Sequence, residues 1–202
     1  MAQTSDGRTT RWAQRRTELL HAVMDCMSRE GLADLSIRRI ARQIGVSAPT
    51  LLHHFSSKEQ LFAQALAALQ RDEIAILTQA FAGKGIAEGL KSLWQIHVTH
   101  GNRDQLRASS EFQAIALRDP GRFPSYHQNV TRPWVEVLHK ALASSGCPDD
   151  QRIAMATLLG GAYRGLLTDL LATGEIRRVS QGFDALMTLV RDVEIGWRHA
   201  SH

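Results

Sequence analysis

The stretch IARQIGVSAPTLLHHFSSKEQL, residues Ile40 to Leu61, places two short apolar runs on either side of a single glycine. Before the glycine, apolar residues recur at the i, i+3, i+4, i+7 spacing of a buried helical stripe. These residues are Ile37, Ile40, Ala41 and Ile44. Gly45 can adopt the left-handed conformation that a sharp turn needs. The pattern therefore predicts a short helix that ends in a tight bend.

A second short helix, over residues 48 to 55, is predicted after this bend. Ser47 can cap its N-terminus, and Leu51 and Phe55 share one face at i, i+4. Two helices joined by a glycine turn and held by apolar side chains form a helix-turn-helix. The outward residues of the second helix are compact enough to approach base edges and phosphates in a major groove. They are Pro49, Thr50, His53 and His54.

Helices are also predicted on both sides of this motif. One runs from about Arg11 to Glu30, with Gly31 as its C-cap, and the ten polar residues before it are expected to be loose. Ser36 can cap the first helix of the motif. Ser57 and Gln60 form a capping box for a long helix that reaches about residue 81.

The rest of the chain reads as further amphipathic helices over about residues 86–100, 104–118, 124–146, 149–173 and 180–198. Pro133 lies inside the third of these, which predicts a kink or break near Arg132. The last helix has a continuous inward apolar stripe. Its members are Phe183, Leu186, Met187, Val190, Val193 and Trp197. No strand pattern competes, so we expect an all-α protein of about nine helices.

Composition narrows the class of protein. Among the 202 residues no apolar run approaches the roughly 18 that a membrane span needs, and the N-terminus has no signal-peptide core. Cys26 and Cys147 lack metal-ligand spacing, and we interpret them as reduced thiols of a cytoplasmic protein. Residues 1–60 carry nine Lys and Arg against six Asp and Glu, an excess of +3, while the remaining residues carry 15 against 14. This excess fits either an anionic partner or a solvated basic face.

The segment from Arg15 to Leu66 resembles the DNA-binding domain of TetR-type bacterial regulators. The resemblance rests on SIRRIARQIGVSAPTLLHHFSSKEQL, Ser36 to Leu61, which combines I-A-x-x-x-G-V-S with H-F-x-S-K-E-x-L. It implies a helix-turn-helix domain over residues 1–56 and a helical domain for effector binding and dimerisation over residues 57–202. The implied activity is transcriptional regulation, most often repression, through double-stranded DNA.

The resemblance also implies individual DNA contacts. Ser36, Arg38, His54 and Lys58 would meet phosphates, while Pro49, Thr50 and His53 would lie against base edges or the nearby backbone. Ser47 would cap the recognition helix at the interface. Leu52 stands where the family usually has a phosphate-binding tyrosine, and Arg39 stands where an acid is common. We interpret the remaining arginines, Arg8, Arg11, Arg15 and Arg16, as a solvated tail in preference to a minor-groove arm.

An effector cavity and a dimer interface are implied for the second domain. The residues placed on the cavity walls are Trp94, His97, Phe112, Tyr126, Asn129, Trp134, Met155 and Tyr163. Such a pocket suits a small, largely apolar ligand of unknown identity. Helices eight and nine would form the homodimer, with Gly160, Gly161 and Gly165 permitting close approach. Two recognition helices would then read a palindromic operator, with half-sites about 34–36 Å apart.

Other activities have little support in the sequence. His97 and His100 lack an acidic or cysteine partner at ligand spacing, so no metal site and no cofactor is predicted. No nucleotide-binding, protease or hydrolase motif is present, so no enzymatic activity is predicted. Two alternatives stay open: a DNA-binding protein of this fold that responds to a protein partner, and a helical enzyme that retains the pocket.

Overall fold

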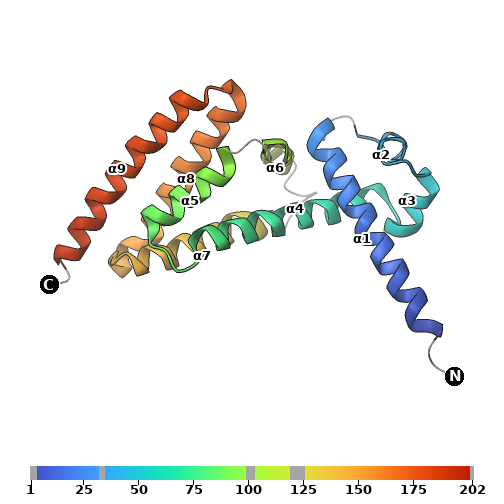
Figure 1. The fold of residues 1–202 in the computed structure, drawn as a ribbon, viewed down its shortest axis with the longest axis horizontal. Coiled ribbons are helices and arrows are strands. Elements are labelled where there is room, and N and C mark those ends of the chain that lie inside the picture. The colour runs from blue at the N-terminus through green and yellow to red at the C-terminus, as the bar shows by residue number, and fades with distance from the viewer. Residues whose placement is uncertain (1–3, 32–34, 99–102, 119–125, 201–202) are drawn as a thin grey trace.

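The computed structural model describes residues 4–31, 35–98, 103–118 and 126–200. These residues contain nine α-helices and no strand, which confirms the all-α prediction. The helices are α1 (Thr4–Glu30), α2 (Ile37–Gln43), α3 (Ala48–Phe55), α4 (Lys58–Phe81), α5 (Ile86–Val98), α6 (Arg103–Arg118), α7 (Tyr126–Ser144), α8 (Asp149–Thr173) and α9 (Ile176–Ala200). Figure 1 shows α1 to α3 at one end of an elongated molecule and the α8–α9 hairpin at the other.

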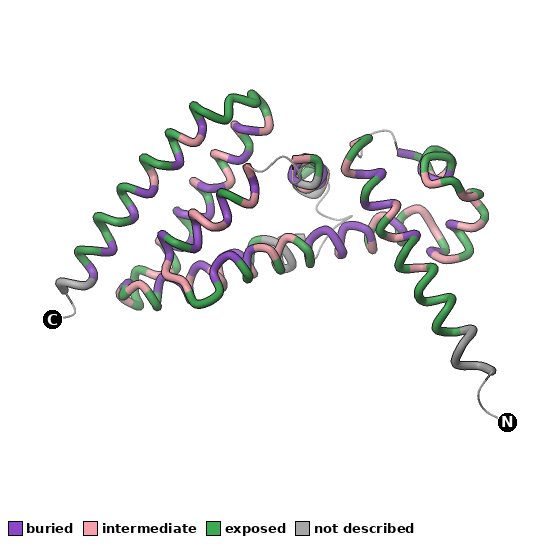
Figure 2. The backbone as a smooth tube through the Cα atoms, viewed as in Figure 1, coloured by how far each residue is buried: buried purple, intermediate pink, exposed green. Residues whose placement is uncertain are grey.

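Two apolar cores lie along this molecule, and α4 runs through both of them. The first half of α4, including Leu61 and Leu69, packs into a core with α1, α2, α3 and part of α6. The second half, including Leu77 and Phe81, packs into a larger core with α5, α7, α8 and α9. The buried segments in Figure 2 follow the same division. A movement of α4 would therefore be felt by both cores.

Local capping signals define the helix-turn-helix region as predicted. Ser36, Ser47 and Ser57 each accept a hydrogen bond from the backbone N–H three residues later, at 3.2, 3.1 and 3.1 Å. Each such cap contributes about 1 kcal/mol to helix stability. Gly45 has φ +71°, in the left-handed region that favours glycine. The short helices α2 and α3 thus have defined ends before any tertiary packing is considered.

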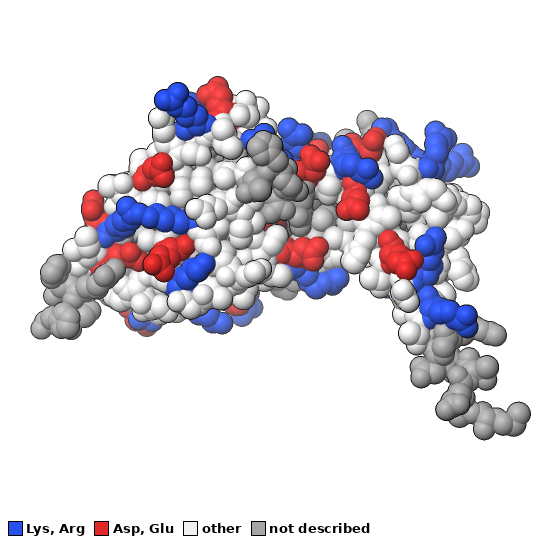
Figure 3. Space-filling model, in the orientation of Figure 1, with Lys and Arg blue, Asp and Glu red and all other residues white. Residues whose placement is uncertain are grey.

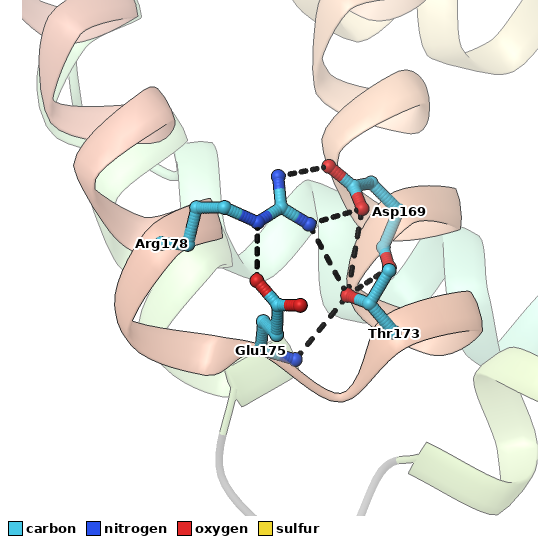
Figure 4. Close-up of polar contacts among 4 residues, drawn as sticks. All are labelled: Asp169, Thr173, Glu175 and Arg178. Carbon is cyan, nitrogen blue, oxygen red and sulfur yellow. Dashed lines mark hydrogen bonds and ion pairs between the residues drawn. The ribbon is translucent and has the colours of Figure 1, made fainter.

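Two predicted helix starts were too late. The helix α1 begins at Thr4, because lengthening a nucleated helix costs little and residues 4–10 contain no proline. The helix α9 begins at Ile176 instead of residue 180. Its first turn is held by Arg178, which donates two hydrogen bonds to Asp169 at 2.7 and 2.8 Å and one to Glu175 (Figure 4). Arg178 lowers the pKa of Asp169 through these bonds.

Of the kink or break predicted near Arg132, no break occurs, since α7 continues through Pro133. A proline removes one backbone donor, and the buried anchors Trp134 and Leu138 hold the next turn in place. Val193 is another correction: it is 39% exposed, because Glu194 and Trp197 occupy the buried face of α9 there. The expected helix ends at Gly101-Asn102 and Asp119-Pro120, and the start near Pro124, lie outside the described residues.

Three further expectations concern the whole chain. Both cysteines are free and buried, and burial raises the pKa of each thiol. No helix among the described residues is long and apolar enough to span a membrane. Within the same residues, no group of three or more His, Cys, Asp or Glu side chains could hold a metal ion.

Candidate nucleic-acid interface and effector region

The helix-turn-helix is held together from the inside. Ile40 of α2 and Leu51 and Phe55 of α3 are fully buried. The backbone N–H of Val46 donates to the carbonyl of Ala41 at 2.9 Å, which closes the turn after Gly45. Because these contacts fix α3 on its inner face, its opposite face is presented to solvent in a defined orientation.

The outer face of α3 consists of Pro49, Leu52 and His53, which are exposed, and Thr50, which is half-buried. The Thr50 hydroxyl lies 2.8 Å from the Ser47 hydroxyl. Leu52 is 41% exposed and makes this face partly apolar, where a tyrosine would have added a hydroxyl. The face therefore offers one imidazole, two hydroxyls and two apolar groups to a partner.

His54 does not point outward as predicted. Its ring lies 5.4 Å from the ring of Trp12 on α1, and its Nδ1 is buried without a hydrogen-bond partner. Burial, followed by the nearby charges of His53, Arg15 and Arg16, lowers the pKa of His54. A neutral, half-buried imidazole in the seam between α1 and α3 is poorly placed to pair with a phosphate.

Arg16 was interpreted as part of a solvated tail, and this interpretation is wrong. Its Nε donates to the carbonyl of His54 at 3.2 Å, and its Nη2 bonds the side chain of Gln64 on α4. Its guanidinium also lies 5.2 Å from the ring of Phe55 and 5.8 Å from that of Trp12. Arg16 thus ties α1 to the end of α3 and to α4. In the sequence, Arg16 lies one turn before the buried stripe of α1, and this position could have indicated its contacts with α3 and α4.

Basic side chains gather at this end of the molecule. Figure 3 shows Lys and Arg over α2 and along α1, with acidic side chains beside them. Arg38 and Arg42 on α2 are exposed. Arg39 is ion-paired with Glu30 at 2.6 Å, so it adds less free charge than its sequence position suggested. Lys58 opens α4, with its ammonium 5.3 Å from the ring of Phe62.

Four of the residues expected in an effector cavity come together in the larger core. His97 Nδ1 lies 2.9 Å from the Tyr163 hydroxyl, and the rings of Trp94 and Trp134 lie 5.9 and 5.7 Å from that of Tyr163. All four side chains are buried. Burial lowers the pKa of His97 to about 4, so its imidazole is neutral at physiological pH. Met155 is partly buried and packs against the larger core.

Three other residues were also expected in the cavity: Phe112, Tyr126 and Asn129. Phe112 belongs to the N-terminal core beside α1 and α4, because its turn of α6 faces the DNA-binding end. Phe112 therefore lies apart from the cluster of Trp94, His97, Trp134 and Tyr163, and its place in an effector cavity stays a prediction. The side chains of Tyr126 and Asn129 lie outside the described residues.

Glu73 is a polar residue of this region that the sequence analysis missed. It lies in the middle of α4 and accepts a hydrogen bond from Ser109 of α6 at 2.9 Å. Burial raises its pKa, and Ser109, Trp134 and Arg164 oppose that rise. The indole N–H of Trp134 is buried and makes no hydrogen bond of normal geometry. In the sequence, the position of an acidic residue between the apolar positions of α4 was the signal that could have identified Glu73.

The sequence of this chain is similar to those of known bacterial regulators. The sequence profile described as "Bacterial regulatory proteins, tetR family" matches residues 19–65, from the buried part of α1 into α4. The HTH-type transcriptional repressor AcnR of Corynebacterium diphtheriae is 25% identical over 187 residues, which cover 90% of this chain and 94% of that protein. These matches support a TetR-family transcriptional regulator.

Another relative and two solved structures are also similar to this chain. The HTH-type transcriptional regulator UidR of Escherichia coli K12 is 26% identical, with 85% of this chain and 90% of that protein covered. A transcriptional regulator from Rhodococcus sp. Rha1 superposes with a TM-score of 0.73 at 22% identity, over 86% of this chain and 94% of the other. Salmonella enterica GusR superposes with a TM-score of 0.63 at 23% identity, over 90% of this chain and 94% of the other. These structures show the fold. The profile and the curated relatives support a DNA-binding transcriptional regulator.

Proposed function

We propose that this TetR-family regulator is a repressor that binds a palindromic operator as a homodimer and is released by a small, largely apolar effector. The observation that carries the proposal is the outer face of α3, whose Pro49, Leu52 and His53 are exposed and pack against nothing in the chain's own cores. A defined helix with a compact outer face fits the major groove.

The DNA contacts divide by chemistry. Pro49, Thr50 and His53 would face base edges, and the exposed Arg38 and the Lys58 ammonium at the start of α4 would neutralise phosphates. Ser36 already accepts a backbone hydrogen bond as a cap, so its hydroxyl proton is available to a phosphate oxygen. The hydroxyls of Ser47 and Thr50 share one hydrogen bond, which leaves one proton of the pair for the DNA. His54 would act by supporting α3 against α1. Residues 1–56 would form the DNA-binding domain and residues 57–202 the regulatory domain.

The α8–α9 hairpin supports a homodimer. Gly161 and Gly165 lie on the outer face of α8, and a Cβ built on either would meet nothing within 4 Å. A glycine inside a helix costs about 1 kcal/mol relative to alanine, and no packing against the described residues offsets this cost at Gly161 or Gly165. Large apolar residues are exposed on the two helices. They are Ile153, Leu158, Leu189 and Val193, which are 65%, 63%, 63% and 39% exposed. A second copy would bury them and use the glycines for close approach.

Effector release would work through α4 and α6. Both helices contribute to both cores, and the bond between Glu73 and Ser109 joins them beside Trp134 and Tyr163. An effector that enters between α5 and α8 beside Trp134 would disturb this junction. A coupling of about 1–3 kcal/mol would lower operator affinity about 5- to 150-fold.

The test is fluorescence anisotropy with duplexes that tile the DNA flanking the protein's own gene. Wild type should bind one duplex with an affinity that falls steeply with salt. Arg38→Ala should weaken binding and reduce the salt slope by about 1, whereas Arg132→Ala, on the exposed part of α7, should change neither. Compounds that raise the melting temperature should release the duplex. The proposal fails if Arg38→Ala binds every duplex as wild type does, or if stabilising compounds leave affinity unchanged.

A further inference from the structure

A groove of about 880 Å³ lies at the end of the regulatory domain farthest from the helix-turn-helix. It is formed where α5 begins, α7 ends and the second half of α9 passes, at the end that carries the C-terminus in Figure 1. Its volume falls in the range typical of small-molecule sites. The aromatic cluster of Trp134 and Tyr163 contributes nothing to its walls.

Glu194 is the unusual residue of this groove. It occupies the buried stripe of α9, between Val190 and Trp197, and is only 7% exposed. No hydrogen bond or ion pair joins its carboxylate to any residue that the structure describes. Its carboxylate lines the groove, where a positively charged ligand group could reach it. A ligand that binds the carboxylate would explain the position.

The surroundings of Glu194 limit what such a ligand can be. Gly85 lies close by, since a Cβ built on it would be 3.6 Å from the Glu194 carboxylate. The same Cβ would be 2.7 Å from the Ser145 hydroxyl, so glycine is needed to keep this part of the groove open. Ser145 accepts a hydrogen bond from the Ile86 backbone N–H at 2.8 Å, which leaves its own hydroxyl proton available.

The groove also has an apolar wall and a basic edge. Ala87 and Ile195 provide the apolar contact, and Ile195 is 52% exposed on a face of α9 that is otherwise polar. Lys91 and Arg191 line the groove, and neither forms an ion pair with a described residue. Glu88 adds one exposed carboxylate. One groove that is lined by the Glu194 carboxylate and by two basic side chains fits a ligand with a positive end and a negative end.

We propose that this groove is a second ligand site that binds a small organic zwitterion, with its ammonium group on Glu194 and its carboxylate facing Lys91 and Arg191. The hydrocarbon between the two charges would lie on Ala87 and Ile195. This site goes beyond the proposed effector region, because none of its lining residues belongs to the aromatic cluster.

Isothermal titration of the full chain with three ligands of equal length tests the charge pattern. The ligands are 6-aminohexanoate, 1,6-diaminohexane and hexanoate. The zwitterion should bind at least tenfold more tightly than either of the others. Absence of binding by all three, or equal binding of the diamine and the zwitterion, would overturn the proposal.

Two variants assign the binding to the groove. Glu194→Gln should weaken zwitterion binding at least tenfold while the melting temperature stays the same or rises, whereas Glu18→Gln on α1 should change neither. Lys91→Glu should reverse the preference, so that 1,6-diaminohexane binds more tightly than 6-aminohexanoate. A merely structural role for Glu194 would not produce that reversal. Unchanged binding by Glu194→Gln, or an unchanged preference in Lys91→Glu, would refute the site.

Discussion

Replacement of Arg16 by alanine should destabilise the N-terminal core and disturb the recognition helix. The change removes a hydrogen bond to the carbonyl of His54, another to Gln64, and contacts with the rings of Trp12 and Phe55. A hydrogen bond from a charged group contributes about 1.5–3 kcal/mol, and an exposed cation–π contact about 0.5–1 kcal/mol. Because Arg16 is half-buried and its contacts are not additive, we expect a total of about 2–3 kcal/mol.

Urea unfolding followed by tryptophan fluorescence, at one fixed protein concentration, measures this effect. Arg15→Ala is the matched control, since Arg15 is exposed and pairs only with Glu18 at 3.1 Å, an interaction worth at most about 1 kcal/mol. Arg16→Ala should also weaken DNA binding, because the carbonyl at the end of α3 loses its support. A loss below about 0.5 kcal/mol, or equal losses for the two variants, would refute the reasoning.

Three further predictions test other parts of the account. Gly161→Ala should raise the helix stability of α8 by about 1 kcal/mol yet weaken dimerisation, which sedimentation equilibrium would detect; unchanged dimerisation would place the interface elsewhere. His97 has its folded pKa lowered to about 4 from 6.5, so the unfolded chain binds its proton first and stability falls as pH drops. The drop in unfolding free energy from pH 7 to pH 5 should therefore be about 2 kcal/mol larger in wild type than in His97→Gln. Equal drops in the two proteins would contradict this. Phe112→Ala should lower the free energy of unfolding in urea by about 3–5 kcal/mol, while the affinity for the effector stays unchanged. A selective loss of effector binding would show that Phe112 lines the cavity.

The features that local sequence determines were predictable. Ser36, Ser47, Ser57 and Gly45 set the ends of α2, α3 and α4 through neighbouring backbone groups, and the structure agrees at each position. Periodicity also identified the buried stripe of α9, apart from Val193. These signals act within a few residues of one another, so a single sequence contains them.

The errors came from contacts between distant residues. Nothing near His54 in the sequence shows that Trp12 covers its ring, or that Arg16 bonds its carbonyl from 38 residues away. Phe112 and Ser109 lie on one helix, yet they face different partners because α6 bridges both cores. The path of α7 past Pro133 depends on the burial of Trp134. In each case tertiary packing decided what local propensity left open.

Selection from randomised duplex DNA, with wild type compared against His53→Ala, shows whether the outer face of α3 reads bases. We expect wild type to enrich a palindrome whose half-sites are about one helical turn, or a multiple of it, apart. We also expect His53→Ala to lose preference at base pairs within each half-site. Enrichment of no palindrome, or the same enriched sequence from both proteins, would contradict the claim that the outer face of α3 reads DNA as part of a dimer.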